Sequence, residues 1–232
     1  MARTSDFVPK ESIEADTLVL LGEYGRRYAV AMKPPIPVEE IIEAHLGLRF
    51  DFADLPRLMN IPNVLGATWF RDRKVKIDQS LDPSVFPDKL GRCRFTVAHE
   101  IGHWALHRHK YLSTEGQATM FACDENPVIC RSNDKSQLEW QADSFAGCLL
   151  MPKDMVFDQW EAIHGNRKPY VAIDEIADLK ARWGLGDDER PTVDVARQLA
   201  PVFEVSAQAM QIRLVDLRLV RTKAPELGLF SR

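Results

Sequence analysis

The chain has 232 residues, of which 45% are hydrophobic and 28% are charged, and its formal net charge is −4. A chain of this length can bury a core as one large domain, or as one domain with a small unit appended. The negative balance argues against a general electrostatic attraction to nucleic acid or to anionic membranes, so any such contact would depend on a local patch.

The N-terminal part of the chain predicts neither a secretion signal nor a membrane span. Its longest uncharged apolar run, TLVLLG at 17–22, is too short for either. We therefore expect a cytoplasmic protein without a membrane partner. The cysteines are few and irregularly spaced, which argues against a disulfide scaffold and predicts reduced thiols. They are Cys93, Cys123, Cys130 and Cys148.

Two helices and a hairpin are expected first. Apolar residues in ESIEADTLVLLGEYGRRYAV recur near helical spacing, and PVEEIIEAHLG has Pro37 at a helix start and Gly47 just past a helix end. Two short strands follow, at about 65–70 and 74–78, joined by the polar tip Arg-Asp-Arg at 71–73.

A longer helix is expected over about 87–107, because its apolar residues recur at helical rather than alternating spacing. Residues 110–135 lack clear periodicity and read as a long loop, and loops of that length are usually functional. The next helix is expected to begin near Ser136 and to end at Pro152, which also suits the first turn of a further helix.

The last part of the chain predicts a small helical unit. Polar segments with Gly and Pro mark a transition near 164–191. Beyond it, the pattern predicts a helix, a short turn at 203–205, Ser206 as the N-cap, and a second helix. This is the layout of a helix-turn-helix.

The chemistry concentrates in RFTVAHEIGHWALHRH, residues 94–109, which holds four of the six histidines. His99, Glu100 and His103 spell H-E-x-x-H. On a helix, residues four apart lie one turn above each other, so both imidazoles can bind one cation. Glu100 lies one residue further round, where it can accept a proton from a water that the metal activates. The alternative is a pair of satisfied core histidines.

A third ligand would distinguish a metal site from a pair of core histidines, and the segment 94–109 itself offers two candidates. His109 stands where H-E-x-x-H-x-x-G-x-x-H would place a third histidine, but Leu106 replaces the turn-forming glycine. The helix should therefore continue and carry His109 away. His107 lies a further turn along, roughly 6 Å from His103 by rise alone, so it should line the cleft or face solvent instead of binding the same ion.

The other candidate is Glu139 in EWQAD, with Asp143 one turn further along the same helix. A carboxylate would complete a two-histidine, one-glutamate set, and an aspartate there can hold the other N–H of a ligand histidine. The competing interpretation of Glu139 is a capping box, because Ser136 to Glu139 fits S-x-x-E.

RFTVAHEIGHWALHRH, then ICRS and EWQADSFAGCLLMPKD, closely resemble the ImmA/IrrE family of metallopeptidases. The family pattern is F-T-x-A-H-E-x-G-H followed by E-x-x-A-[DN]-x-F-A-x-x-L-L-M-P. The resemblance spans roughly residues 35–155 and, more weakly, the C-terminal helices. It implies that His99, His103 and Glu139 bind zinc, that Glu100 is the base, and that Asp143 supports a ligand histidine.

The resemblance also implies the architecture. We expect an α+β, mainly helical, zincin-like fold of the minimal gluzincin kind, with a small sheet beside the cleft. The metallopeptidase domain should span 1–164, and a helix-turn-helix-like region should span 165–232. An edge strand of the sheet can hold an extended peptide by main-chain hydrogen bonds. Our candidate is 65–70, and the alternative is that it is an internal strand.

Several other residues carry weaker hypotheses. Cys123 and Cys130 are too widely spaced for a usual zinc knuckle, and Cys148 is expected to be a small buried residue. The group that stabilises the oxyanion is left open. Its candidates are Tyr170, His164, Arg131 and His107.

Two functions follow. The first is a zinc endopeptidase, in which Mn²⁺ or Fe²⁺ would also suit the ligands, and its resemblance implies limited proteolysis of a DNA-binding helix-turn-helix repressor in response to stress or mobile-element signals. The second is a non-catalytic, metal-stabilised binding module that acts through its helix-turn-helix-like region. Residues 191–221 carry four Arg against three acidic residues, so direct nucleic-acid binding is not expected.

Overall fold

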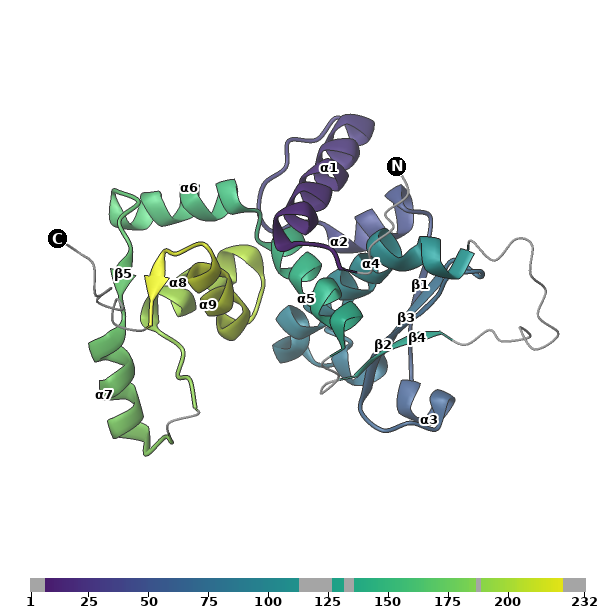
Figure 1. Cartoon of the computed structure of the whole chain (residues 1–232). Coiled ribbons are helices and arrows are strands. Elements are labelled where there is room, and N and C mark those ends of the chain that lie inside the picture. The colour runs from purple at the N-terminus through teal and green to yellow at the C-terminus, as the bar shows by residue number, and fades with distance from the viewer. Residues whose placement is uncertain (1–6, 113–126, 132–135, 187–188, 223–232) are drawn as a thin grey trace. The chain divides into compact units, whose positions relative to one another are not determined.

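The computed structural model describes residues 7–112, 127–131, 136–186 and 189–222. The chain forms two compact units, one up to Pro152 and one from Lys153 onward (Figure 1). The helix that follows Pro152 belongs by its contacts to the second unit, whereas the predicted domain division at 164/165 would leave it in the first. The predicted boundary at 164/165 separates a metallopeptidase domain from a helix-turn-helix-like region by function, so it stays a prediction.

The first unit begins with two helical segments. Helix α1 spans Lys10–Tyr28. Helix α2, Val38–Glu40, continues directly into the π-helical turn η1, Ile41–His45. Pro37 precedes the first helical residue, and Gly47 follows the last turn with a φ of 65°. Both N-terminal helices predicted from the sequence are confirmed, and the predicted start and stop residues flank the second one.

A four-stranded mixed sheet lies in the same unit, in the order β1-β3-β2-β4. The strands are β1 Arg49–Ala53, β2 Val64–Trp69, β3 Lys74–Asp78 and β4 Val128–Arg131. Strands β2 and β3 form the predicted antiparallel hairpin, and β1 pairs with β3 in parallel. Strand β1 was not predicted, although the alternation of Phe50 and Phe52 with polar neighbours is a local signal for a strand.

The prediction of an edge strand at 65–70 is wrong. Strand β4 pairs antiparallel with β2 on the side opposite β3, so β2 is internal. The stretch 110–135 is also not loop throughout, because β4 lies inside it. A four-residue strand is too short to give a periodic signal, and its pairing depends on a partner more than fifty residues earlier in the sequence.

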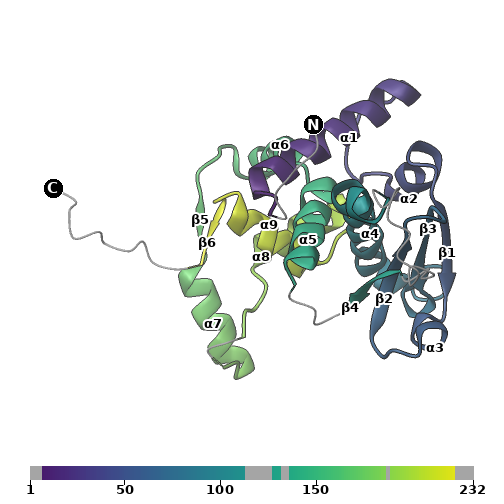
Figure 2. The same ribbon diagram turned by 45° about the vertical axis from the view of Figure 1, so that its right-hand side comes forward.

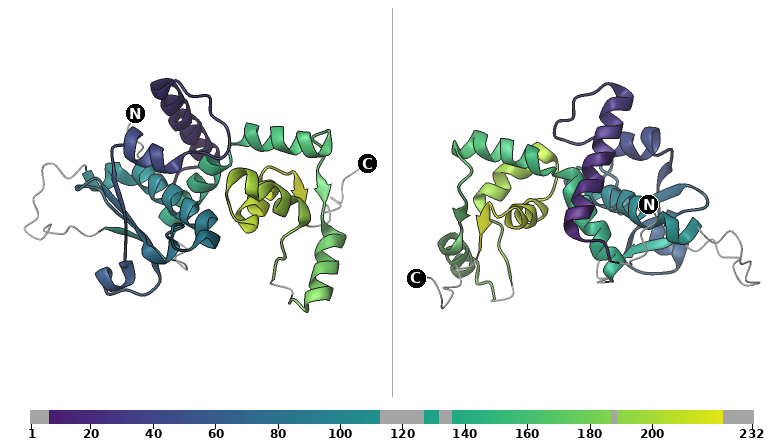
Figure 3. Two further views of the ribbon diagram at one scale, coloured as in Figure 1. Left: turned by 180° about the vertical axis from the view of Figure 1, so that it is seen from behind. Right: turned by 45° about the horizontal axis from the view of Figure 1, so that its top comes forward.

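Two helices form the centre of the unit. Helix α4 spans Leu90–Leu112 and α5 spans Gln137–Leu150. They pack side by side next to the sheet, with α4 lying against β2 and β3 (Figure 2). Helix α1 crosses α5 on its other side (Figure 3). Three short turns, α3 Leu55–Met59, η2 Gln79–Leu81 and η3 Pro87–Lys89, complete the connections.

The α4–α5 contact depends on a small residue within the histidine motif. A Cβ added to Gly102 would lie 3.0 Å from Phe145 Cβ and 3.1 Å from Ala142 Cα. Glycine therefore lets the two backbones approach closely, in the turn between His99 and His103. This close approach brings the first turn of α5 within reach of both histidines.

The second unit contains the predicted pair of helices. Helix α8 spans Asp194–Phe203 and α9 spans Ala207–Asp216, and they pack against each other. The chain turns at Glu204 with a φ of 51°, and the Ser206 hydroxyl accepts a hydrogen bond from the Ala209 backbone N–H. The helices, the turn and the N-cap of the helix-turn-helix layout are thus confirmed.

Helices α6 Lys153–His164 and α7 Ile173–Trp183 belong to the same unit, and α6 confirms the helix predicted after Pro152. A small parallel pair, β5 Tyr170–Val171 and β6 Val220–Arg221, connects the segment before α7 with the segment after α9. The structure is therefore a mainly helical α+β fold with a small mixed sheet. Within the described ranges, no helix has both the length and the apolar character that crossing a membrane requires.

Candidate metal centre

Helix α4 places the motif's side chains in the interior of the first unit. His99, Glu100, His103 and His107 are all buried. The helix continues to Leu112, and His109 lies exposed on it. The expectation that Leu106 would prolong the helix and carry His109 away is confirmed.

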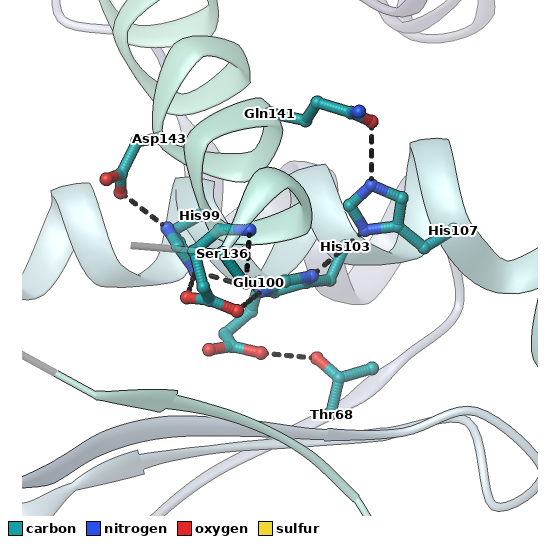
Figure 4. A network of polar contacts seen from close by, with 9 residues as sticks. Thr68, His99, Glu100, His103, His107, Ser136, Gln141 and Asp143 are labelled. Carbon is teal, nitrogen blue, oxygen red and sulfur yellow. Dashed lines mark hydrogen bonds and ion pairs between the residues drawn. The ribbon is translucent and has the colours of Figure 1, made fainter. Parts of the chain in front are cut away.

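Glu139 comes to the two histidines from the first turn of α5. Its Oε2 lies 3.1 Å from His99 Nε2, and its Oε1 lies 3.1 Å from His103 Nε2. The two Nε2 atoms are 2.9 Å apart. Figure 4 shows the resulting cluster between the helices. Of the residues that the structure describes, only His99, His103 and Glu139 form such a group, with one ligand atom from each all within 4.8 Å of one another.

The capping interpretation of Glu139 is correct for its backbone. Ser136 is the N-cap of α5, and its hydroxyl accepts a hydrogen bond from the Glu139 N–H at 3.4 Å. The Glu139 carboxylate, however, lies against the two histidines and is buried there. The same residue therefore helps to start the helix with its backbone and contributes its side chain to the cluster.

Asp143 lies one turn beyond Glu139 and contacts the far side of His99. Its Oδ1 is 2.8 Å from His99 Nδ1, while the aspartate side chain is 58% exposed. An aspartate oxygen in this position accepts the Nδ1 proton, which leaves Nε2 of His99 as the nitrogen that faces the cluster and can bind a metal.

The electrostatics keep Glu139 ionised. Burial by itself would raise the pKa of this carboxyl, but the hydrogen bonds and charges of His103 and His99 outweigh it and lower the pKa to about 2. Two imidazole nitrogens and one carboxylate oxygen are the protein donor set of many zinc hydrolases. The donor chemistry of these three side chains therefore fits a divalent metal, zinc above all.

Glu100 points from α4 toward the sheet instead of toward α5. Its Oε2 accepts a hydrogen bond of 2.6 Å from the Thr68 hydroxyl on β2. Its Oε1 has no hydrogen-bond partner among the residues that the structure describes, although the side chain is fully buried. Burial raises the pKa of Glu100, and the charges of His103 and His99 and the Thr68 hydrogen bond only partly oppose that rise.

Gly66 on β2 makes room for Glu100. A Cβ built at Gly66 would lie 2.3 Å from Glu100 Oε1 and 3.0 Å from Glu100 Cδ. Any other residue would displace the carboxylate. Gly66 and Thr68 were not among the residues predicted from the sequence, yet a glycine inside a strand is a usual sign that another group approaches closely.

His107 neither lines a cleft nor faces solvent, which corrects the expectation from the sequence. It is 1% exposed and lies behind His103, with its Nδ1 3.0 Å from His103 Nδ1. Its Nε2 lies 3.1 Å from Gln141 Oε1. Burial, more than any neighbour, lowers the pKa of His107 to about 4. Because both ring nitrogens have partners inside the protein, His107 is a poor candidate for oxyanion stabilisation.

The remaining oxyanion candidates belong to the second unit or have side chains that the structure does not describe. Tyr170 and His164 belong to the second unit, and their roles stay predictions. Nothing is described of Cys123 or of the side chains of Cys130 and Arg131. Cys148 is buried on α5 outside any disulfide, as expected.

Comparison with protein families relates this part of the chain to a known domain. A family model described as the IrrE N-terminal-like domain, peptidase M78, matches residues 88–215, which is more than half of the chain. No curated protein matches the chain. The matched segment begins just before α4 and includes every residue of the cluster.

Proposed function

The chain belongs to the M78 family of metallopeptidases, which the IrrE N-terminal-like domain defines, and on this premise we propose that it is a zinc-dependent endopeptidase. The family implies a zincin-like fold. The observation that carries the proposal is the buried group of His99, His103 and Glu139 with Glu100 beside it. A purely structural metal site would close its fourth position and would have no use for a buried, half-partnered carboxylate next to it.

In this proposal His99 and His103 bind the metal through Nε2, and Glu139 binds it through its carboxylate. Zinc held there supplies a Lewis acid for a peptide carbonyl and increases the acidity of a water molecule. Mn²⁺ and Fe²⁺ suit the same three donors. Asp143 keeps the His99 ring oriented by accepting its Nδ1 proton.

Glu100 is the proposed general base. Thr68 holds its Oε2, so Oε1 is the oxygen left to accept a proton from the attacking water. The raised pKa makes the carboxylate a stronger base than an ordinary glutamate, which favours taking the proton. Glu100 then returns it to the nitrogen of the leaving amine, so it ends the cycle ionised as it began.

We propose β4, in place of residues 65–70, as the strand that would hold the substrate. Among the described strands it forms an edge of the sheet, and its neighbour β2 carries Thr68 and Gly66, which contact Glu100. An extended peptide can pair with such an edge through its main chain. We therefore expect a cut in an exposed interdomain linker or a locally unfolded helix of the substrate, and a compact folded protein should resist.

We propose that the substrate is a helix-turn-helix transcriptional repressor, whose cleavage in the cytoplasm would relieve repression under stress. The test is to incubate the wild type and Glu100→Gln with repressors encoded next to its gene, with zinc present, and to map cuts by intact-mass spectrometry. Cleavage by the wild type alone supports the proposal. If only unrelated proteins are cut, the regulatory role fails and the peptidase remains.

Metal analysis tests the ligand assignment separately. We expect one metal per chain in the wild type, loss in His99→Ala, His103→Ala and Glu139→Ala, and full retention in His109→Ala, because His109 is exposed. Retention in Glu139→Ala together with loss in His109→Ala would reverse the choice of third ligand.

The helix-turn-helix layout of α8 and α9 is the observation that favours the second candidate, a metal-stabilised regulator without turnover. Its charge argues against DNA binding. Arg213 is buried, and Arg197 is paired with Asp194, so two of the four arginines in 191–221 are not available to phosphates. We expect no tight, salt-dependent DNA binding in a shift assay, and sequence-selective binding at moderate salt would favour the regulator.

A further inference from the structure

A second line of buried polar side chains leads away from the cluster through His103. His103 Nδ1 lies 3.0 Å from His107 Nδ1, and His107 Nε2 lies 3.1 Å from Gln141 Oε1. His107 is 1% exposed and Gln141 is fully buried. Figure 4 shows the three side chains in sequence, from α4 across to α5. The function proposed above does not use His107 or Gln141.

The chemistry of each atom gives this line a direction. An amide oxygen only accepts, so His107 Nε2 carries the proton in its contact with Gln141. In a neutral imidazole the other nitrogen is then an acceptor, so His107 Nδ1 accepts from His103 Nδ1. With its proton on Nδ1, His103 can offer Nε2 to a metal that it would share with Glu139 and His99.

We propose that His107 and Gln141 are positioning residues that keep the proton of His103 on Nδ1 and so hold its Nε2 ready to bind the metal. The inference rests on the proposed function, because it concerns the same metal centre. It gives His103 what Asp143 gives His99, a partner for the nitrogen that faces away from the cluster.

Asp143 and His107 differ in charge because the surroundings of the two histidines that they contact, His99 and His103, differ. Asp143 is 58% exposed, so a charged acceptor is well solvated there. The far side of His103 is completely buried between α4 and α5. A second carboxylate in that position would carry a large desolvation cost, whereas a neutral imidazole and an amide supply the same acceptor without a net charge.

Two substitutions of His107 separate positioning from packing. His107→Leu fills much of the space but removes the acceptor, and His107→Asn leaves a larger cavity but can place its Oδ1 near the position of Nδ1. If His107 only fills the core, Leu is the milder change, because large cavities cost more stability. If His107 positions His103, Asn is the milder change for metal binding.

Gln141→Leu is a second test that leaves His107 in place. It removes the acceptor of the His107 Nε2 proton and should weaken metal binding less than His107→Leu, because it acts one hydrogen bond further from the ligand. The matched control is His109→Asn, which removes an exposed histidine two residues away on the same helix.

The measurement is the zinc dissociation constant by competition with a chromophoric chelator, together with urea unfolding of the zinc-free proteins. We expect His107→Leu to raise the constant by about 10- to 100-fold, the usual effect of losing a partner of a ligand histidine. His107→Asn should recover most of this loss although its zinc-free form is less stable than that of His107→Leu. His109→Asn should match the wild type.

Ring ¹⁵N NMR of the zinc-loaded wild type gives the independent readout, with the proton expected on Nδ1 of His103 and on Nε2 of His107. Equal zinc affinities of the wild type and His107→Leu, or a better affinity in Leu than in Asn, would overturn the inference alone. A proton on Nδ1 of His107 would also overturn the inference, because His107 would then donate a hydrogen bond to His103 Nδ1 instead of accepting one. A wild type that holds no metal would overturn the proposed function and this inference with it.

Discussion

The two sides of helix α4 treat their buried polar groups differently. On the side that faces α5, His99 and His103 each have a partner for Nδ1, namely Asp143 and His107, and both Nε2 atoms meet Glu139. On the side that faces the sheet, Thr68 bonds one oxygen of Glu100. The other oxygen has no hydrogen-bond partner among the described residues.

In the proposed function, this difference separates the groups that would hold the metal, His99, His103 and Glu139, from the group that would react, Glu100. A side chain binds a metal most tightly when hydrogen bonds already fix its orientation, because no free energy is then needed to orient it during binding. A base needs an oxygen that can still take a proton. A buried carboxylate with an unsatisfied oxygen is costly for folding, and such costs are usually found at functional sites.

Gly66→Ala should give the largest effect, because it acts on the reactive side alone. The added Cβ would fall 2.3 Å from Glu100 Oε1 and 3.0 Å from Thr96 Cγ2. Both atoms are ends of side chains, so we expect these side chains, above all the carboxylate, to move while the fold persists. Displacement of a reacting group by about 1 Å costs roughly 100-fold in rate. We expect that loss in a peptide-cleavage assay, with zinc content unchanged.

Gly147→Ala on α5 is the matched control for this prediction. A Cβ there meets no atom within 4 Å, so activity should be unchanged. The helix should gain up to about 1 kcal/mol, because alanine favours a helix interior over glycine. Undiminished cleavage by Gly66→Ala would mean that the position of Glu100 is unimportant for the reaction. The proposed difference in role between the two sides of α4 would then be wrong.

Asp143→Ala should instead affect zinc binding, which depends on the side of α4 that faces α5. It removes the acceptor 2.8 Å from His99 Nδ1, and we expect zinc binding to weaken by about tenfold. The low end of the usual range applies because the side chain is 58% exposed, so solvent can replace it in part. Asp143→Asn keeps an acceptor oxygen and should lose less. A variant that binds zinc normally but cleaves slowly would place Asp143 on the reactive side.

Thr68→Val keeps the shape of the side chain and removes the hydrogen bond to Glu100 Oε2. A hydrogen bond to a charged group is worth roughly 1.5–3 kcal/mol, so we expect kcat to fall by about tenfold or more with little change in KM. Thr68→Ser retains the hydroxyl and serves as the control. Equal rates in the Val and Ser variants would show that the bond does not orient the base.

The sequence predicted the side of α4 that faces α5, with the proposed metal ligands, better than the side that faces the sheet, with Glu100. His99, His103 and Glu139 could be proposed because helical spacing and donor type limit which residues can share an ion. Their convergence is seen in the structure, and their role as ligands stays a proposal. The surroundings of Glu100 depend on β2, some thirty residues away, and no local pattern reports that contact.

The same distinction explains the errors in the fold. The helices of α1, α4, α5, α8 and α9 follow from local spacing and caps, so they were predicted. Strand β4 and the internal position of β2 depend on pairing between distant segments, and β5–β6 joins segments about fifty residues apart. His107 was misjudged because burial depends on what α5 brings against it, above all Gln141.

The smallest expected effect is on stability, and it tests whether the reactive side weakens the fold. Burial raises the pKa of Glu100 from its ordinary value of 4.5, so the zinc-free folded protein binds this proton more tightly than the unfolded chain. The resulting loss of stability is absent below about pH 4.5 and grows as the pH rises through the folded pKa. Glu100→Gln cannot ionise and should escape this loss.

The difference in the free energy of unfolding between Glu100→Gln and the wild type should therefore be smallest near pH 4 and increase as the pH rises, because only the wild type then carries an ionised carboxylate at this buried position. Urea unfolding of the zinc-free proteins at several pH values measures it. Glu11→Gln on α1, an exposed acidic position, gives the baseline for a charge change without burial. A difference that stays constant with pH would mean that Glu100 does not titrate abnormally. A difference that shrinks would mean that the buried carboxylate is stabilised by its neighbours, and Glu100 would then resemble Glu139 instead of contrasting with it.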